Sequence, residues 1–245
     1  MFDSFFALKR QLVHLRRKVF ERLGSDRYSW LALNALDRKL LPYLSYRGGF
    51  FVELGANDGL SQSNTYYYER WLGWRGILIE AVPELYRRAV RARPKARVFN
   101  CACVSFTYPH PDIAIAYAGL MSVVKNSWAD PDQESKHVAI GRQLERINGP
   151  HEIRVPARTL TSILDECQVS RIDLLSLDVE GYEPEVLAGL DLERYRPRYM
   201  LIEVRDPEGV EALILPHYER VEQMSELDML YRLREDTSAG VSSQR

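Results

Sequence analysis

Three acidic side chains follow two apolar stretches of the chain, at points where parallel strands would end. Asp178 and Glu180 come after the apolar run 172–177, and Glu203 closes the run 199–203. In an open parallel sheet, ligands bind outside the carboxyl ends of the strands. Clustered carboxylates raise one another's pKa, which suits a general base working near neutral pH. These three side chains are therefore the candidate catalytic residues.

Two further roles are open to the same carboxylates. Asp178, Glu180 and Glu203 could together hold a divalent cation, since oxygen ligands favour Mg²⁺ and a metal lowers the pKa of a hydroxyl directly. Asp178 and Glu180 could also cap a helix that opens at Tyr182, where negative charge is favourable. A capping role would not exclude a catalytic one.

An acidic, glycine-containing turn follows the first apolar run. It reads Glu53-Leu54-Gly55-Ala56-Asn57-Asp58-Gly59. Gly55 permits a tight turn, Gly59 permits close helix packing, and Asn57 tolerates a positive φ. Glu53 and Asp58 would repel a pyrophosphate. The turn instead suits S-adenosylmethionine, which has no phosphate and carries a positive sulfonium and ammonium.

A fourth acidic residue, Glu80, supports the same cofactor. It ends the second apolar run, about 20 residues after Gly59, where an acidic side chain can accept hydrogen bonds from ribose hydroxyls. A glycine turn alone can be an ordinary connection, and a lone glutamate can be a solvated strand end. Their occurrence on consecutive strands favours a cofactor site.

The elements that must position these residues alternate between short apolar runs and helical segments, as in βαβ units with a parallel sheet. The predicted strands are 50–54, 76–80, 97–101, 172–177 and 199–203. Two later runs, 217–223 and 227–233, are too close together for a helical crossover. They predict an antiparallel pair at the sheet edge.

Several separated blocks of the chain resemble the FkbM family of methyltransferases. The blocks are residues 51–59, 63–65, 72–80, 158–160 and 177–183. The resemblance covers about residues 48 to 233. It implies a class I methyltransferase sheet of the Rossmann-like α/β kind, mostly parallel with an antiparallel last strand and helices on both faces. It also implies methyl transfer from S-adenosylmethionine to oxygen.

The resemblance also implies which residues bind the cofactor. They are Glu53, Gly55, Asn57, Asp58, Gly59 and Glu80, with Asn100, Cys101 and Ala102 near the adenine. The predicted function is O-methylation of a carbohydrate or glycolipid hydroxyl. The alternatives are a polyketide, lipid or peptide acceptor, or a module that keeps the fold for binding without catalysis.

Residues 1–47 form a predicted helical extension before the methyltransferase domain, residues 48–236. Apolar residues recur every three or four positions in Phe5, Leu8, Leu12, Leu15, Val19 and Leu23. The remaining surface is mostly basic. Such a helix could dock on an anionic membrane surface or pack on the domain or a partner. A second helix is predicted from Tyr28 to Leu41, ending at Pro42.

Between residues 105 and 156, prolines, glycines and aromatics interrupt the strand and helix rhythm, which predicts an insertion on the substrate side. Its Tyr108, Tyr117 and Trp128 could stack on a sugar or belong to the core. Its His137 and His151 could reach an acceptor. The serine-rich tail 237–245 is predicted to be disordered.

Composition narrows the partners and the compartment. A net charge of -1 argues against general binding to nucleic acid. The three cysteines lack the spacing of a zinc site or a disulfide framework, which favours a reducing, cytoplasmic setting. No apolar run approaches the ~18 residues that a membrane span needs.

Overall fold

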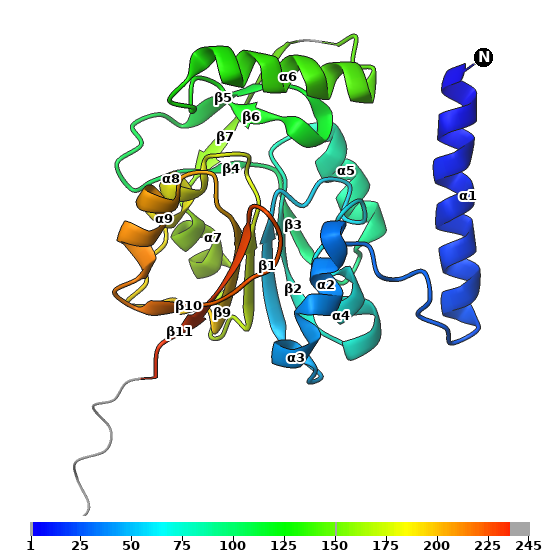
Figure 1. Cartoon of the computed structure of the whole chain (residues 1–245), viewed down its shortest axis with the longest axis horizontal. Helices are drawn as coiled ribbons and strands as arrows, with labels where there is room; N and C mark the ends of the chain where they lie inside the picture. Colours follow the sequence, from blue (N-terminus) through cyan, green and yellow to red (C-terminus); the bar gives the residue numbers. More distant parts are fainter. Residues whose placement is uncertain (1, 150, 236–245) are drawn as a thin grey trace, which may run out of the picture.

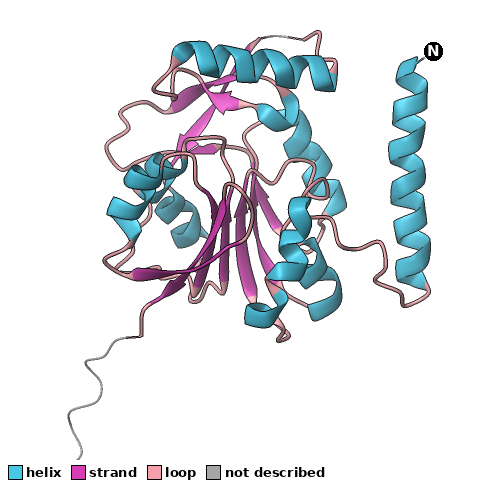
Figure 2. Cartoon of the chain, viewed as in Figure 1, coloured by secondary structure: helices cyan, strands magenta, loops and turns pink. Residues whose placement is uncertain are grey.

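The computed structural model describes residues 2–149 and 151–235, with side chains from residue 12 on. The tail predicted to be disordered lies outside these residues. A seven-stranded sheet forms the centre of the molecule, with the order β10-β11-β9-β8-β1-β2-β3 (Figures 1 and 2). All neighbouring strands are parallel except β11, which runs antiparallel to β9 and β10. The predicted mostly parallel sheet with an antiparallel end is confirmed.

The strands follow the apolar runs closely. They are β1 (Phe50–Leu54), β2 (Arg75–Ile79), β3 (Arg97–Phe99), β8 (Leu174–Leu177), β9 (Tyr199–Glu203), β10 (Tyr218–Gln223) and β11 (Asp228–Leu233). The central strands consist mainly of apolar residues because both of their faces are covered. β2 and β3 end earlier than predicted, so Glu80 and Cys101 lie in the connections that follow them.

Helices cover both faces of the sheet, and alternate strand residues face each layer. Val52 and Ile77 pack with α7 (Leu160–Glu166), α8 (Glu183–Leu187) and α9 (Pro207–Ile214). On the other face, Phe51 and Leu78 pack with α2 (Leu36–Lys39), α3 (Leu41–Leu44), α4 (Tyr66–Leu72) and α5 (Pro83–Ala92). The period of two along each strand produces this division.

The N-terminal segment differs from the prediction. Helix α1 (Phe2–Arg22) is confirmed, but the expected helix 28–41 is replaced by the short η1 (Leu33–Ala35), α2 and α3. The carboxylate of Asp37 accepts hydrogen bonds from the N–H groups of Leu31 and Ala32, which holds this stretch in a non-helical turn. Pro42 lies in the first turn of α3, where its missing N–H removes no helical hydrogen bond.

Part of the predicted extension belongs to the main core. Leu36, Leu40 and Leu44 are buried against Phe51 and Trp74. The boundary predicted at residue 47 therefore falls inside one continuous core.

The insertion is more regular than expected. Its strands β5 (Asp112–Ala116), β6 (Val123–Val124) and β7 (Glu152–Arg158) form a four-stranded sheet with β4 (Ala102–Cys103), which precedes the insertion. The strand order is β4-β7-β5-β6. A short turn, η2 (Gly119–Met121), and helix α6 (Pro131–Glu145) complete the insertion.

None of the described helices is both long and apolar enough to cross a membrane.

Candidate functional site

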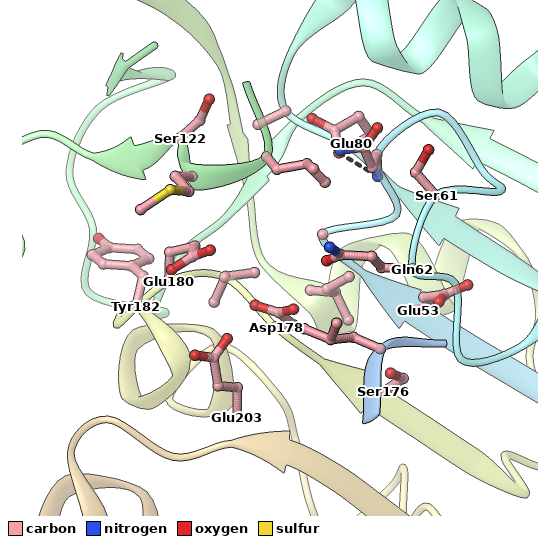
Figure 3. A pocket seen from close by; sticks show the side chains of 18 of the residues that line it. Glu53, Ser61, Gln62, Glu80, Ser122, Ser176, Asp178, Glu180, Tyr182 and Glu203 are labelled. Carbon is pink, nitrogen blue, oxygen red and sulfur yellow. Dashed lines mark hydrogen bonds between the residues drawn. The ribbon is translucent and has the colours of Figure 1, made fainter. Parts of the chain in front are cut away.

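A cavity of about 520 Å³ opens at the carboxyl ends of β1, β2, β8 and β9. This volume is in the range of small-molecule sites. Figure 3 shows Asp178, Glu180 and Glu203 directed toward the same space, with Glu80 on another wall. The fold thus brings the two predicted groups of acidic residues to one cavity.

The glycine turn is shaped by close backbone contact. Gly55 has a φ of +75°, and a Cβ built there would lie 1.9 Å from the backbone oxygen of Asp178. Gly59 has a φ of +78°, and its Cβ would lie 3.1 Å from the Cα of Ala89 in α5. Asn57 has a φ of 50°. A side chain at Gly55 would force the turn away from the β8 connection, so glycine is required there.

Glu80 is buried and holds the turn from β2. Its two carboxylate oxygens accept hydrogen bonds from the backbone N–H of Asn57, at 2.7 Å, and of Val82, at 2.8 Å. Burial raises the pKa of Glu80 to about 7, against the lowering effect of these two bonds. A carboxylate oxygen can accept a second hydrogen bond, so Glu80 retains acceptor capacity toward the cavity.

The two acidic residues of the turn itself, Glu53 and Asp58, accept hydrogen bonds from groups of the protein. Glu53 accepts from Ser63 Oγ at 3.0 Å, from Asn64 N at 2.8 Å and from Thr65 Oγ1 at 2.5 Å. It lines the cavity, but its bonds brace the segment before α4. Asp58 accepts from the N–H groups of residues 60 and 61, which closes a local turn.

A buried arginine locks this region from behind. The side chain of Arg93 is fully buried and donates to Gly59 O, Ser63 Oγ and Thr65 Oγ1, each at 3.1 Å. It also forms an ion pair with Glu69 at 3.0 Å. The sequence analysis missed Arg93, because nothing in its spacing indicates that the end of α5 meets this turn.

The three candidate catalytic carboxylates lie together, with oxygen atoms within 4.8 Å of one another. Desolvation raises the pKa of Asp178 well above its usual range, and a hydrogen bond and negative charge from Glu203 raise it further. Arg205 pairs with Glu180 at 2.6 Å and with Glu203 at 2.7 Å. Within the described residues, no cationic side chain forms an ion pair with Asp178, which sets it apart from the other two.

The predicted helix-capping role is not borne out: among the described residues no side chain caps α8, and Glu183 instead holds the turn before the helix. Glu183 Oε1 accepts from the N–H groups of Val179 and Gly181, at 3.0 and 3.1 Å, and its Oε2 is buried without a hydrogen-bond partner. Burial raises the pKa of Glu183 to about 7. No hydrogen bond from α8 to the side chain of Asp178 or Glu180 is found in the part of the chain that the structure describes.

The insertion reaches this carboxylate cluster through two side chains. Trp128 Nε1 donates to the backbone oxygen of Glu180 at 2.7 Å, and His137 Nε2 lies 3.3 Å from Glu180 Oε2. The rings of Trp128 and His137 are 4.8 Å apart, and Arg205 lies over Trp128. Trp128, named as a candidate for sugar stacking, thus holds the β8 connection in place.

Other predicted residues divide between the cavity wall and its support. Cys101 and Ala102 line the cavity. Asn100 donates to the backbone oxygens of Glu80 and Ala81, at 2.9 and 2.7 Å, and so supports the end of β2. Tyr108 donates to a backbone oxygen within the insertion, and among the described histidines only His137 lines the cavity.

The N-terminal segment supplies a wall that the sequence analysis did not anticipate. Leu33 and Asn34 line the cavity, and Ala32 forms a parallel bridge with Gln62. Arg205 was also missed, although its position two residues after Glu203 at a strand end is a usable signal.

Comparison with known proteins gives consistent matches. A family model described as the methyltransferase FkbM domain matches residues 53–233. Methyltransferase sdnD of Sordaria araneosa is 35% identical over 227 residues, covering 79% of this chain and 85% of that protein.

Two solved structures are similar at lower identity. The methyltransferase FkbM of Methylobacillus flagellatus KT is 14% identical with a TM-score of 0.48, covering 87% of this chain and 52% of that one, so this chain spans about half its length. A TehB-like SAM-dependent methyltransferase of Corynebacterium glutamicum is 12% identical with a TM-score of 0.42, covering 93% and 100%.

Proposed function

Because the chain belongs to the FkbM methyltransferase family, we propose that it transfers a methyl group from S-adenosylmethionine to a hydroxyl of a carbohydrate, in a polysaccharide or a glycolipid. The observation that carries the proposal is the carboxyl group of Asp178. It lies beside the glycine turn, has a raised pKa and forms no ion pair with the described cations.

The residues around the turn fit the proposed cofactor. Gly55 and Asn57 leave the backbone open to close approach, and Glu80 has acceptor capacity for ribose hydroxyls. Cys101 and Ala102 offer a small apolar wall for an adenine ring. The carboxylates favour a positively charged ligand over a nicotinamide dinucleotide, whose pyrophosphate they would repel.

Asp178 is the group that we assign as general base. When bound, S-adenosylmethionine supplies an electrophilic methyl carbon on a positive sulfur. An oxygen of Asp178 would accept the proton of the acceptor hydroxyl, and breaking of the methyl carbon–sulfur bond would leave neutral S-adenosylhomocysteine as the second product. Asp178 suits this step because Arg205 neutralises Glu180 and Glu203 but leaves Asp178 unpaired. A raised pKa makes its ionised form a stronger base.

The same three carboxylates are a candidate Mg²⁺ site, and Arg205 favours the direct-base mechanism over it. The guanidinium already places a positive charge between Glu180 and Glu203, where a cation would otherwise bind. Loss of activity with a chelator, restored by Mg²⁺, would make the carboxylates metal ligands and refute the direct-base assignment.

The test is to incubate the purified protein with S-adenosylmethionine and a panel of glycans, glycolipids, polyketides, lipids and peptides. Release of S-adenosylhomocysteine and product mass identify the acceptor, and NMR locates the methyl group. We expect methylation of a glycan or glycolipid hydroxyl. Turnover restricted to another class would overturn the carbohydrate assignment. If no acceptor is methylated, calorimetry with S-adenosylhomocysteine distinguishes two cases, with NAD as the control that should not bind. Binding of S-adenosylhomocysteine would indicate that the acceptor is missing from the panel, and no binding would indicate a non-catalytic module.

A further inference from the structure

Helix α1 is attached to the domain through its polar side. Glu21 is buried and accepts hydrogen bonds from Tyr66 Oη at 2.9 Å and Ser29 Oγ at 2.8 Å. Arg17 is buried beside it, and Arg70 pairs with Glu21 at 3.2 Å. Figure 1 shows the helix alongside α4, which carries Tyr66 and Arg70. Breaking this buried ionic network would leave unpaired charges, so the attachment fixes how the helix is turned.

The apolar stripe of the helix consequently faces solvent. Its described members are Leu12, Leu15, Val19 and Leu23, with exposed fractions of 55%, 58%, 44% and 76%. Arg17 lies two positions from both Leu15 and Val19, and helix positions two apart point in nearly opposite directions, at about 200°. An amphipathic helix that packed on its own domain would bury this stripe and expose its charges. Here the arrangement is reversed.

Basic side chains flank the stripe on both sides. On the helix, Arg16 lies on one side and Lys18 and Arg22 on the other, and all three are exposed. Arg16 also lies over the ring of Tyr28, 4.0 Å from its centroid. This arrangement suits the surface of an anionic membrane. The apolar side chains would lie among the acyl chains, and the flanking cations would lie at the level of the lipid phosphates. The helix has 21 residues, about 32 Å, and lacks the apolar composition to cross a membrane.

We propose that α1 is a membrane-docking helix that lies in the interface of an anionic phospholipid surface, with the stripe inserted and the basic flanks on the lipid phosphates. The buried contacts of Arg17 and Glu21 hold the catalytic domain to the side of the helix away from the lipid. The proposal does not depend on which acceptor the enzyme methylates.

The test is co-sedimentation of the full chain with vesicles of phosphatidylcholine, alone and mixed with phosphatidylglycerol. We expect binding to the anionic vesicles that weakens as salt is raised. The variant Leu15→Gln/Val19→Gln/Leu23→Gln should lower the partition coefficient by about tenfold or more. The matched control is Val13→Gln, since Val13 is 54% exposed on the same helix but outside the stripe; it should bind normally.

A second variant tests the charges. Arg16→Gln/Lys18→Gln/Arg22→Gln should remove the preference for anionic vesicles by about tenfold or more, and circular dichroism should confirm that each variant is folded. Equal recovery of the full chain with and without vesicles overturns the proposal, as does unchanged binding of the stripe variant. A concentration-dependent dimer that the stripe variant loses, without vesicle binding, assigns the stripe to a second copy and also overturns it.

Discussion

At the scale of single residues, the carboxylates in and beside the cavity differ in what surrounds them. Glu180 and Glu203 share Arg205, and Glu80 and Glu183 hold backbone N–H groups. Among the described residues, neither a cationic side chain nor a backbone N–H group bonds to the carboxylate of Asp178, and its pKa is strongly raised. Environment therefore assigns these chemically similar groups to different roles.

Replacing Asp178 by Asn should separate catalysis from binding. Loss of a positioned general base lowers kcat by about 10² to 10⁴, while the affinity for S-adenosylmethionine stays near its original value. Glu180→Gln should also lower kcat, because it weakens the Arg205 pair. Single-turnover kinetics and calorimetry measure the two quantities. Asp132→Asn, on the exposed side of α6, is the control. Full activity of Asp178→Asn would eliminate Asp178 as the base.

Replacing Glu80 should affect the cofactor. In Glu80→Gln the amide nitrogen must face a backbone N–H, because both carboxylate oxygens accept one. We expect the affinity for S-adenosylhomocysteine to fall by about 1 to 3 kcal/mol in calorimetry. Glu84→Gln on α5, which is exposed, should bind normally. Unchanged affinity in Glu80→Gln would remove Glu80 from the cofactor site.

Glu183 should make stability depend on pH. Its pKa is raised from 4.5 to about 7 in the fold, so the folded state binds the proton more tightly than the unfolded chain. The resulting stabilisation is complete below pH 4.5 and is lost as the pH rises to about 7. Glu183→Gln should therefore gain up to about 3 kcal/mol over the original protein between pH 4.5 and 8.

Urea unfolding at several pH values tests this. The contribution of Glu80, whose pKa is also raised, is present in both proteins and cancels in the comparison. Glu185→Gln, exposed on the same helix, should leave the pH dependence as it is. Parallel stability curves for the original protein and Glu183→Gln would refute the prediction.

At the scale of elements, helix α6 reaches the cluster of Asp178, Glu180 and Glu203 because of one glycine. A Cβ at Gly141 would lie 2.7 Å from Met121 Cβ and 2.8 Å from Ala118 O, so only glycine lets α6 pack this closely on η2. His137 lies one turn earlier on the same face and contacts Glu180. The spacing between α6 and η2 therefore sets the position of His137.

Gly141→Leu should move α6 outward and withdraw His137 from Glu180. A displacement of about 1 Å in an element that positions a reacting group can lower kcat by about 10- to 100-fold. The affinity for the cofactor should remain unchanged. Steady-state kinetics and calorimetry measure both. Ile140→Leu, at an exposed neighbouring site, is the control. Normal turnover in Gly141→Leu would show that the α6 contact has no catalytic effect.

The elements also show what the sequence could and could not predict. Strands β1, β8 and β9 are predictable because their apolar runs are buried on both faces, and Glu80 and Asp178 follow from the ends of such runs. The strands of the insertion are short, and β4 and β6 have two residues each, too few for a pattern. The contact of His137 with Glu180 depends on how α6 docks and on the positive φ of Glu180, which no spacing in the sequence reveals.

At the scale of the whole molecule, the first 47 residues divide into two parts with different consequences for folding. The part up to residue 27 contacts the domain mainly through the network around Glu21. The part from Tyr28 contributes Trp30, which stacks on Tyr67 at 3.5 Å, and the three buried leucines of the core. Only the second part supports the sheet.

Two shortened chains test this division. A chain that begins at Tyr28 should fold and bind S-adenosylhomocysteine nearly as well as the full protein. One that begins at Gly48 loses three buried leucines, worth about 1.5 to 3 kcal/mol each, which approaches the total stability of a typical domain. Thermal unfolding and size-exclusion chromatography measure the outcome. A cooperative transition in the shorter chain would show that the core is complete without α2 and α3.

The second sheet has a consequence for how this protein diverges from its relatives. Strands β5, β6 and β7 satisfy their hydrogen bonds largely among themselves. The second sheet joins the segment that follows β3 through the two residue pairs of β4 with β7. The insertion that contacts Glu180 is thus nearly a self-contained unit. The turn around Gly55, by contrast, packs tightly against the segment after β8 and against α5. We therefore expect mutations to accumulate more readily in this insertion than in the turn, so that the acceptor can change over evolutionary time while the methyl donor stays the same.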